Sequence, residues 1–229
     1  MNIVWLGHST FLFEIDSKQN VLIDPWIEGN PRAPQGYSLP AVHSILLSHG
    51  HGDHTGDAIS ISRKNGCKVV CNYEISLWLE KKGVETCSPM NKGGMQTVGD
   101  LEVTMTHAFH SSSMQDGDAV VYGGEPAGYI IRIPDGRRIY FAGDTAVFGD
   151  MRLIARLYEP DLAILPIGDL YTMGPKEAAV AVEFLGVKKV IPMHYGTFPP
   201  LTGTPAALRA LVGADVEVIE LEPGTPYAY

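Results

Sequence analysis

The densest group of metal-ligating side chains in this sequence is the segment His49-Gly50-His51-Gly52-Asp53-His54. It places three imidazoles and one carboxylate within six residues, and the intervening glycines let the backbone turn tightly so that the side chains converge. Imidazole nitrogens and carboxylate oxygens together suit zinc, iron or manganese. A polar turn whose histidines only cap the next helix is the alternative interpretation. Because the chain has only 8 histidines in 229 residues, we favour a metal site.

Three more segments that follow predicted strands carry side chains of the same kinds. His110 lies in the sequence Thr-His-Ala-Phe-His-Ser-Ser, Asp144 in Phe-Ala-Gly-Asp-Thr, and His194 in Ile-Pro-Met-His-Tyr-Gly-Thr-Phe. His107 is an alternative to His110, but along a strand the two would point to opposite faces, so only one can be a ligand. We prefer His110, because serines follow it and a loop opens there.

The elements that must position these side chains form an internal repeat. Residues 11–23 and 129–141 each have the pattern of a β-hairpin, with an apolar strand, a polar turn and a second apolar strand. A third buried strand follows each hairpin, at 44–48 and 162–166, so that the two sets lie 118 residues apart throughout. Chance similarity of apolar patterns is the alternative.

Helical patterns follow the third strand of each set, at 56–64 and 175–185, and further helices are expected at 74–82, 150–158 and 205–211. Hairpins combined with strand–helix units predict an α/β protein in which two mixed β-sheets pack face to face with helices outside, a four-layer αββα sandwich. We expect one domain over 1–229, with repeat halves of about 1–110 and 127–229.

The composition excludes several classes of partner. Lys and Arg number 17 against 26 Asp and Glu, a net charge of −9, so the chain lacks the cationic surface that binds nucleic acids or anionic lipid. No apolar run approaches the roughly 18 residues that a membrane-spanning helix needs. Met1 leads into an apolar strand pattern without a basic leader, which favours a cytoplasmic protein.

The spacing His-x-His-x-Asp-His after a buried strand resembles that of the metallo-β-lactamase-fold hydrolases. The remaining motifs occur in that superfamily's order, so the resemblance covers nearly the whole chain. The N-terminal motifs Gly7-His8-Ser9-Thr10 and Ile23-Asp24-Pro25-Trp26 are similar to a branch that contains lactonases and phospholipase-D-type phosphodiesterases. Small metal-dependent hydrolases of that branch are the most similar group. The resemblance implies the metallo-β-lactamase fold.

The resemblance also implies a dinuclear site, with zinc the expected metal and manganese or iron as alternatives. It assigns one ion to His49, His51 and His110, a second to Asp53, His54 and His194, and a bridging role to Asp144. Asp53 and His8 are the candidate catalytic residues: Asp53 would orient the nucleophile, and His8 or a metal-bound water would protonate the leaving group. Asp24 is either a residue that orients a ligating histidine or a turn residue before proline.

Two divalent ions that share a hydroxide attack carbonyl or phosphoryl centres, so we expect cleavage of an ester, lactone or phosphodiester bond of a small molecule. A mononuclear iron oxygenase or related redox enzyme on the same fold, and a non-catalytic metal- or ligand-binding protein, are the alternatives. An imidazole at position 51, where oxygen-reducing di-iron members carry glutamate, favours hydrolysis. Three predicted loops, 29–39, 89–96 and 111–128, would shape the substrate site. The resemblance allows a homo-oligomer.

Overall fold

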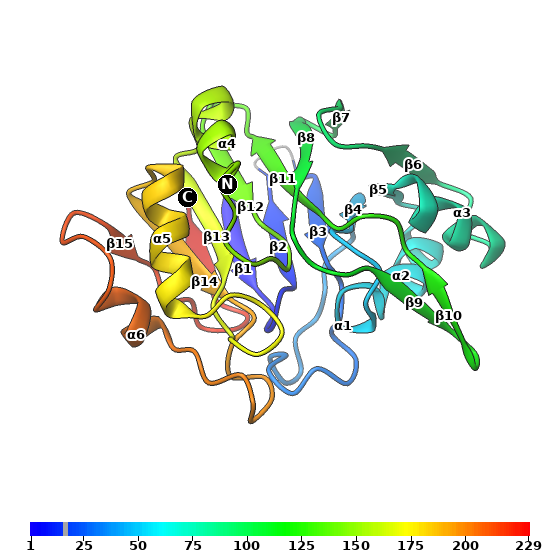
Figure 1. Cartoon of the computed structure of the whole chain (residues 1–229). Coiled ribbons are helices and arrows are strands. Elements are labelled where there is room, and N and C mark those ends of the chain that lie inside the picture. The colour runs from blue at the N-terminus through cyan, green and yellow to red at the C-terminus, as the bar shows by residue number, and fades with distance from the viewer. Residues whose placement is uncertain (16–17) are drawn as a thin grey trace.

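The computed structural model describes residues 1–15 and 18–229 and contains two seven-stranded mixed sheets (Figure 1). The turn predicted between the first two strands of the repeat therefore falls partly outside the described residues. In spatial order, the strands of the first sheet are β16 (Pro226–Ala228), β1 (Asn2–Trp5), β2 (Phe11–Glu14), β3 (Asn20–Ile23), β4 (Ser44–Leu46), β5 (Lys68–Asn72) and β6 (Cys87–Met90).

The second sheet has the same sequence of pairings as the first. Its strands are, in order, β15 (Glu217–Val218), β14 (Lys189–Met193), β13 (Leu162–Pro166), β12 (Arg138–Phe141), β11 (Ala127–Arg132), β8 (Leu101–His107) and β7 (Met95–Val98). In each sheet an antiparallel hairpin, β2–β3 or β11–β12, is followed by three parallel pairings. The boundaries proposed for the repeat halves remain a prediction.

The main core lies between the two sheets, because side chains alternate along each strand. Trp5 and Phe11 of the first sheet belong to one buried cluster with Tyr129 and Phe141 of the second, and the rings of Phe11 and Phe141 meet edge to face at 6.0 Å. The intervening side chains, such as Val4, face the helices, so the strands are apolar on both faces.

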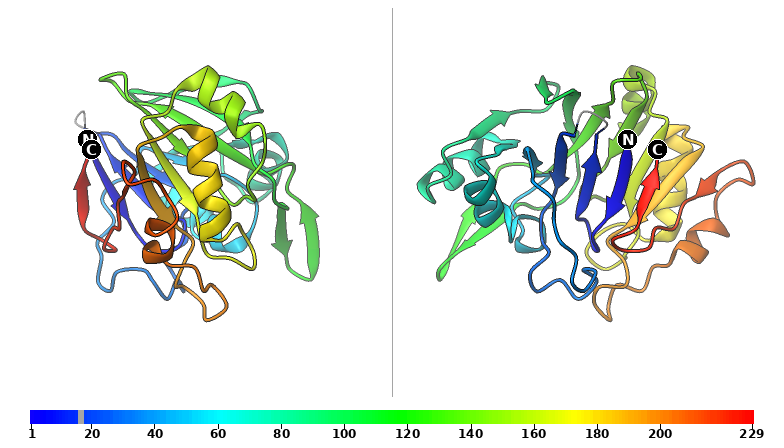
Figure 2. Two further views of the ribbon diagram at one scale, coloured as in Figure 1. Left: turned by 60° about the vertical axis from the view of Figure 1, so that its left-hand side comes forward. Right: turned by 180° about the vertical axis from the view of Figure 1, so that it is seen from behind.

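Helices cover the outer faces of the sheets, which gives the predicted four layers (Figures 1 and 2). They are α1 (Gly52–Thr55), α2 (Ala58–Asn65) and α3 (Tyr73–Lys81) beside the first sheet, and α4 (Met151–Tyr158), α5 (Pro175–Leu185) and α6 (Pro205–Arg209) beside the second. The α/β sandwich expected from the sequence is confirmed. No helix in the described part of the chain is both long enough and apolar enough to cross a membrane.

Two local features were not predicted. A short helix, α1, precedes α2, which forms the helix expected at 56–64, and the loop expected at 111–128 contains a separate hairpin of β9 (Ser113–Asp116) and β10 (Ala119–Tyr122). The two residues between these strands, Gly117 and Asp118, form a hairpin turn of a recognised kind, which the irregular composition of the segment obscured. This hairpin extends away from the two large sheets (Figure 1).

Candidate metal centre

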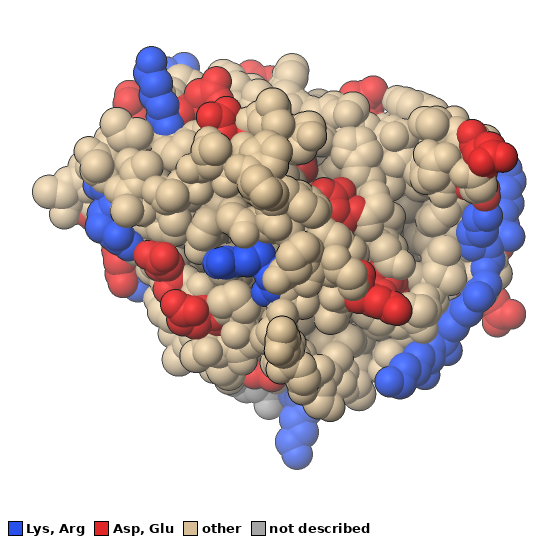
Figure 3. Space-filling model, turned by 90° about the horizontal axis from the view of Figure 1, so that it is seen from below, with Lys and Arg blue, Asp and Glu red and all other residues tan. Residues whose placement is uncertain are grey.

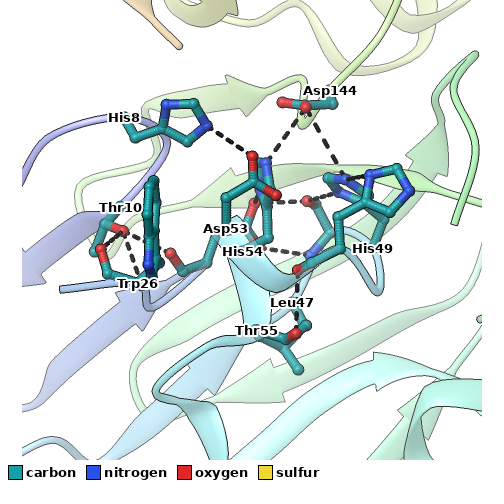
Figure 4. A network of polar contacts seen from close by, with 12 residues as sticks. His8, Thr10, Trp26, Leu47, His49, Asp53, His54, Thr55 and Asp144 are labelled. Carbon is teal, nitrogen blue, oxygen red and sulfur yellow. Dashed lines mark hydrogen bonds and ion pairs between the residues drawn. The ribbon is translucent and has the colours of Figure 1, made fainter. Parts of the chain in front are cut away.

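Loops that follow five strands bring the candidate ligands to one end of the two sheets. They follow β1, β4, β8, β12 and β14 and carry, in that order, His8, residues 49–54, His110, Asp144 and His194. In Figure 4, the side chains of Asp53, His54 and His49 come from below and Asp144 from above, so that the polar groups of both sheets meet. The convergence that the sequence predicted for these segments is therefore present.

The carboxylate of Asp144 lies at the middle of this group. Its Oδ2 atom is 3.0 Å from Nε2 of His194 and 3.3 Å from Nε2 of His54. The Nε2 atoms of His110 and His49 are 3.7 and 4.0 Å away. Burial would raise the pKa of Asp144, but the imidazoles of His194 and His54 hold it well below its usual range. One ionised carboxylate therefore faces imidazoles from both halves of the chain.

Among the described residues, three groups of ligand atoms each have their members within 4.8 Å of one another. Two of them share no residue, and we call these the first group and the second group. The first contains His49, His51 and His110, and the second contains His8, Asp53, His54 and His194. The third, Asp24, His49 and His54, takes one histidine from each. The second group is larger than the sequence predicted, because His8, expected as a catalytic residue, lies among the candidate ligands.

The donor set of the centre fits divalent ions of the zinc, manganese and iron class. Within the described residues, Oδ1 of Asp144, Nε2 of His54 and Nδ1 of His194 are buried without a hydrogen-bond partner, and buried polar atoms are rarely left so. Burial lowers the pKa of both His49 and His51, which favours the neutral imidazole that coordinates a metal. These side chains therefore fit a bound metal ion better than they satisfy one another's hydrogen bonds.

Asp24 links the second group to Ser48 in the segment that follows β4. Its Oδ2 is 2.8 Å from Nδ1 of His54, and its Oδ1 accepts a hydrogen bond of 2.7 Å from the backbone amide of Ser48. Burial opposes the charged form of His54, yet the carboxylates of Asp144 and Asp24 raise its pKa well above the usual value. Of the two sequence interpretations of Asp24, orientation of a histidine matches these contacts.

His8 connects Asp53 to the loop after β14. Its Nε2 is 3.1 Å from Oδ2 of Asp53, and its Nδ1 is 2.9 Å from Oγ1 of Thr197. Burial lowers the pKa of His8 to about 4, and, although burial raises the pKa of Asp53, the contact with His8 holds it below its usual range. A neutral His8 that donates from Nε2 to the carboxylate must accept at Nδ1, which the Thr197 hydroxyl satisfies.

The backbone around the centre is tightly constrained. A Cβ atom on Gly50 would lie 2.5 Å from Sδ of Met114 in β9, and the Gly50 amide donates to Oγ of Ser112. The β9–β10 hairpin thus packs directly against the His49–His54 loop. His8, Asp24 and His194 all have left-handed backbones, with φ of 53°, 47° and 57°, a conformation that non-glycine residues adopt at a cost.

The structure separates the alternative histidines from the centre. His110 belongs to the first group, whereas His107 ends β8 and is exposed. His43 is also exposed, and its Nδ1 accepts a hydrogen bond from the backbone amide of Asn20. Thr197 is not among the residues that the sequence predicts for the site. Its contact with His8 joins positions 189 residues apart, and no local pattern reveals it.

Comparison with known proteins agrees with this geometry. Residues 19–195 match the family described as "Beta-lactamase superfamily domain". The chain is 55% identical over 227 residues to the UPF0173 metal-dependent hydrolase of Solibacter usitatus, covering 99% of each chain. It is 48% identical over 229 residues to the UPF0173 metal-dependent hydrolase of Koribacter versatilis, covering 100% of this chain and 98% of the other. The solved structure of Igni18, a metallo hydrolase of Ignicoccus hospitalis, has a TM-score of 0.86 and 36% identity, covering 99% of this chain and 97% of that one.

Proposed function

The chain belongs to the metal-dependent hydrolases of the beta-lactamase superfamily, and from this membership we propose that it cleaves an ester, lactone or phosphodiester bond of a small molecule. The observation that carries the proposal is the position of Asp144, whose Oδ2 lies within 4.0 Å of four imidazole nitrogens supplied by both halves of the chain. A carboxylate in that position suits two cations, one for each group.

We propose that the first group and the second group each hold one divalent ion, that Asp144 contacts both, and that zinc is the metal. When bound, such a pair lowers the pKa of bound water toward about 7 and polarises the substrate oxygen. Within the second group, His8 is the member to which we assign a proton-transfer role, and Asp53 the member that orients the attacking water. Manganese or iron would fit the same donors.

The proton needed by the leaving group is held at Nε2 of His8. Thr197 fixes the tautomer by donating to Nδ1, and the carboxylate of Asp53 accepts from Nε2 and holds the ring in one orientation. Burial keeps His8 neutral near pH 7, so a proton that it gives to the leaving oxygen must be replaced at once. Asp53 would take a proton from the attacking water and return it to Nε2, which restores the neutral ring. Asp24 orients His54 and is not itself one of the proposed ligands. It contacts Nδ1 of His54, which leaves Nε2 of that ring free to coordinate an ion.

We place the reaction in the cytoplasm and take a small, non-nucleic-acid molecule as the substrate. The net charge of −9 supports the choice of a substrate other than nucleic acid, because a nuclease needs cationic residues to bind the phosphate backbone.

The test is a hydrolase screen of the zinc-loaded protein with p-nitrophenyl acetate, a γ-lactone and bis(p-nitrophenyl) phosphate. Asp144→Ala should lower kcat/KM by more than about 100-fold, because it removes a group that contacts both ions, whereas removal of an outer orienting group costs about 10–100-fold. His43→Ala is the matched control, since it removes an exposed imidazole outside the centre. Failure of the fully loaded protein to cleave any of the three substrates, or equal activity of Asp144→Ala, would overturn the proposal.

A further inference from the structure

A cavity of about 250 Å³ lies between β8 and α4. Met105 and His107 of β8 line one side, and Leu153 and Leu157 of α4 line the other side. Phe148, which follows Asp144 in the loop after β12, also lines the cavity. The two leucines are 50% and 68% exposed, which is unusual for large apolar side chains that face a common hollow. The fold therefore keeps an apolar surface open here.

Phe109 connects this cavity to the centre. It lies between His107, which lines the cavity, and His110 of the first group, and its ring is 4.9 Å from that of Phe148. Its backbone amide donates to Oγ1 of Thr145, and its carbonyl accepts from the amide of Ala146. Phe109 is thus fixed to the loop that carries Asp144, although its side chain is 58% exposed.

Few charges compete with an apolar occupant. The ionisable residues that line the cavity are Lys92, His107 and Asp150, and the remaining lining side chains are apolar apart from Thr106 and the Tyr158 hydroxyl. Figure 3 shows the end of the molecule from which the loops after β3, β13 and β14 extend, and there acidic groups lie beside an otherwise uncharged hollow. Lys and Arg side chains gather along the right-hand edge of this view and not in the hollow, and the cavity lining contains one lysine and no arginine, so neither offers a cationic pocket for a polyanionic substrate.

We propose that the substrate is an uncharged ester or lactone with an apolar chain, and that this chain lies across Phe109 and enters the cavity between β8 and α4. The proposal rests on the proposed function, because it takes the scissile carbonyl to lie at the candidate metal centre. A methylene group is similar in size to a water molecule, about 30 Å³, so the cavity holds a chain on the order of eight carbon atoms.

A second apolar surface borders the centre on the side of His8, and its aromatic rings pack against one another. Trp26 and Phe198 lie on the His8 side, with ring centroids 5.2 and 6.0 Å from that of His8. Their own rings are 5.9 Å apart, so they pack against each other and His8 as a wall. We assign the chain to the Phe109 side because a cavity adjoins it.

The first test compares p-nitrophenyl esters from acetate to decanoate on the zinc-loaded protein. The wild type should cleave octanoate with a kcat/KM at least about tenfold above that for acetate, because each buried methylene adds to transition-state binding. Leu153→Arg should lose most of this preference and keep the acetate rate within about twofold, since it introduces a charge at the cavity and leaves the candidate ligands intact. Leu211→Arg is the matched control, being similarly exposed at 53% but outside the cavity lining.

Two kinetic results would overturn the inference: equal rates for all chain lengths in the wild type, or a preference that Leu153→Arg retains. Loss of the preference in Phe198→Ala and not in Leu153→Arg would also overturn it, because the chain would then bind on the His8 side.

Binding of N-phenyl-1-naphthylamine, an uncharged fluorescent probe, separates failure of this inference from failure of the proposed function. Octanol should displace the probe from the wild type and from Leu211→Arg, whereas Leu153→Arg should bind it much more weakly. Binding without cleavage of any ester supports the apolar site and contradicts the proposed hydrolysis of esters. Absence of probe binding to the wild type contradicts the apolar site, whatever the enzyme cleaves.

Discussion

The two candidate ligand groups differ in how the protein holds them. In the first group, His51 and His110 are partly exposed, and Nε2 of His51 is 3.4 Å from the hydroxyl of Ser111. In the second group, His8, His54 and His194 are buried, and buried or half-buried polar partners orient His8 and His54. In the first group only His49 is buried, and it is held by the hydroxyl of Ser48 and by His51, so the second group is the more deeply buried of the two.

The two groups also differ in the charge of their side chains. The first group consists of imidazoles alone, while the second contains the carboxylate of Asp53, and Asp144 lies between the two groups. A carboxylate offsets the charge of a cation and imidazole does not, so the second group should bind a divalent ion more tightly and exchange it more slowly. Four substitutions test this difference.

The largest effect should come from His54→Ala. His54 lies between Asp144 and Asp24 at distances of 3.3 and 2.8 Å, so its removal leaves two buried carboxylates without their shared partner. The metal-free protein should lose about 3–5 kcal/mol of unfolding free energy, the range for breaking a buried ion pair. Urea unfolding measures this, and a loss below about 1 kcal/mol would show that His54 carries no charge in the folded state.

His51→Ala should weaken ion binding by the first group and leave the second group unchanged. His51 is partly exposed and its contacts are with His49 and Ser111, so the free energy of unfolding should change by less than about 1 kcal/mol. The variant should still retain the ion of the second group after dialysis, and elemental analysis should find one ion per chain where the wild type holds two. Loss of both ions would contradict independent binding by the two groups.

Asp24→Asn changes an orienting residue and keeps its size. The amide cannot provide the charge that the carboxylate of Asp24 presents to Nδ1 of His54, so the affinity of the second group for zinc should fall by about 10–100-fold. Competition with a chromophoric chelator gives the two affinities separately. The first group should lose less affinity, because Asp24 reaches His49 through the hydroxyl of Ser48, whereas it contacts His54 directly. An equal fall at both groups would contradict this difference.

Thr197→Val should have the smallest effect. It replaces the hydroxyl that contacts Nδ1 of His8 with a methyl group, and it should lower kcat by roughly tenfold through loss of the fixed tautomer. Zinc affinity and KM should remain within about twofold, while Thr197→Ser should restore most of kcat. A variant that loses zinc and activity together would assign Thr197 a structural role.

The sequence predicts site residues that lie in short motifs or directly after clear strands, and it does not predict contacts between residues that are far apart in the chain. His49, His51, Asp53 and His54 form one short motif, and the other candidate ligands follow strands whose apolar patterns are clear, so their meeting at one sheet edge was foreseeable. The partner of Asp24 lies 30 residues away, and a turn before proline explained Asp24 equally well without it.

Local patterns were also weak where strands are short or exposed. The strand β16 pairs with β1 across almost the whole chain, which places the two termini side by side (Figure 2), but its three residues contain proline and have no alternating pattern. The β9–β10 hairpin was hidden in a segment that resembled an irregular loop, although it packs Met114 against Gly50 of the metal motif. Only the tertiary structure connects this hairpin to the centre.

The central claim is that two cations bind between the loops of the two sheets. Anomalous diffraction at the zinc edge from crystals of the zinc-loaded protein tests it most directly. We expect two peaks, one within about 2.3 Å of ligand atoms of the first group and one within the same distance of the second, with Asp144 next to both. A difference map without a peak at either group would contradict the account.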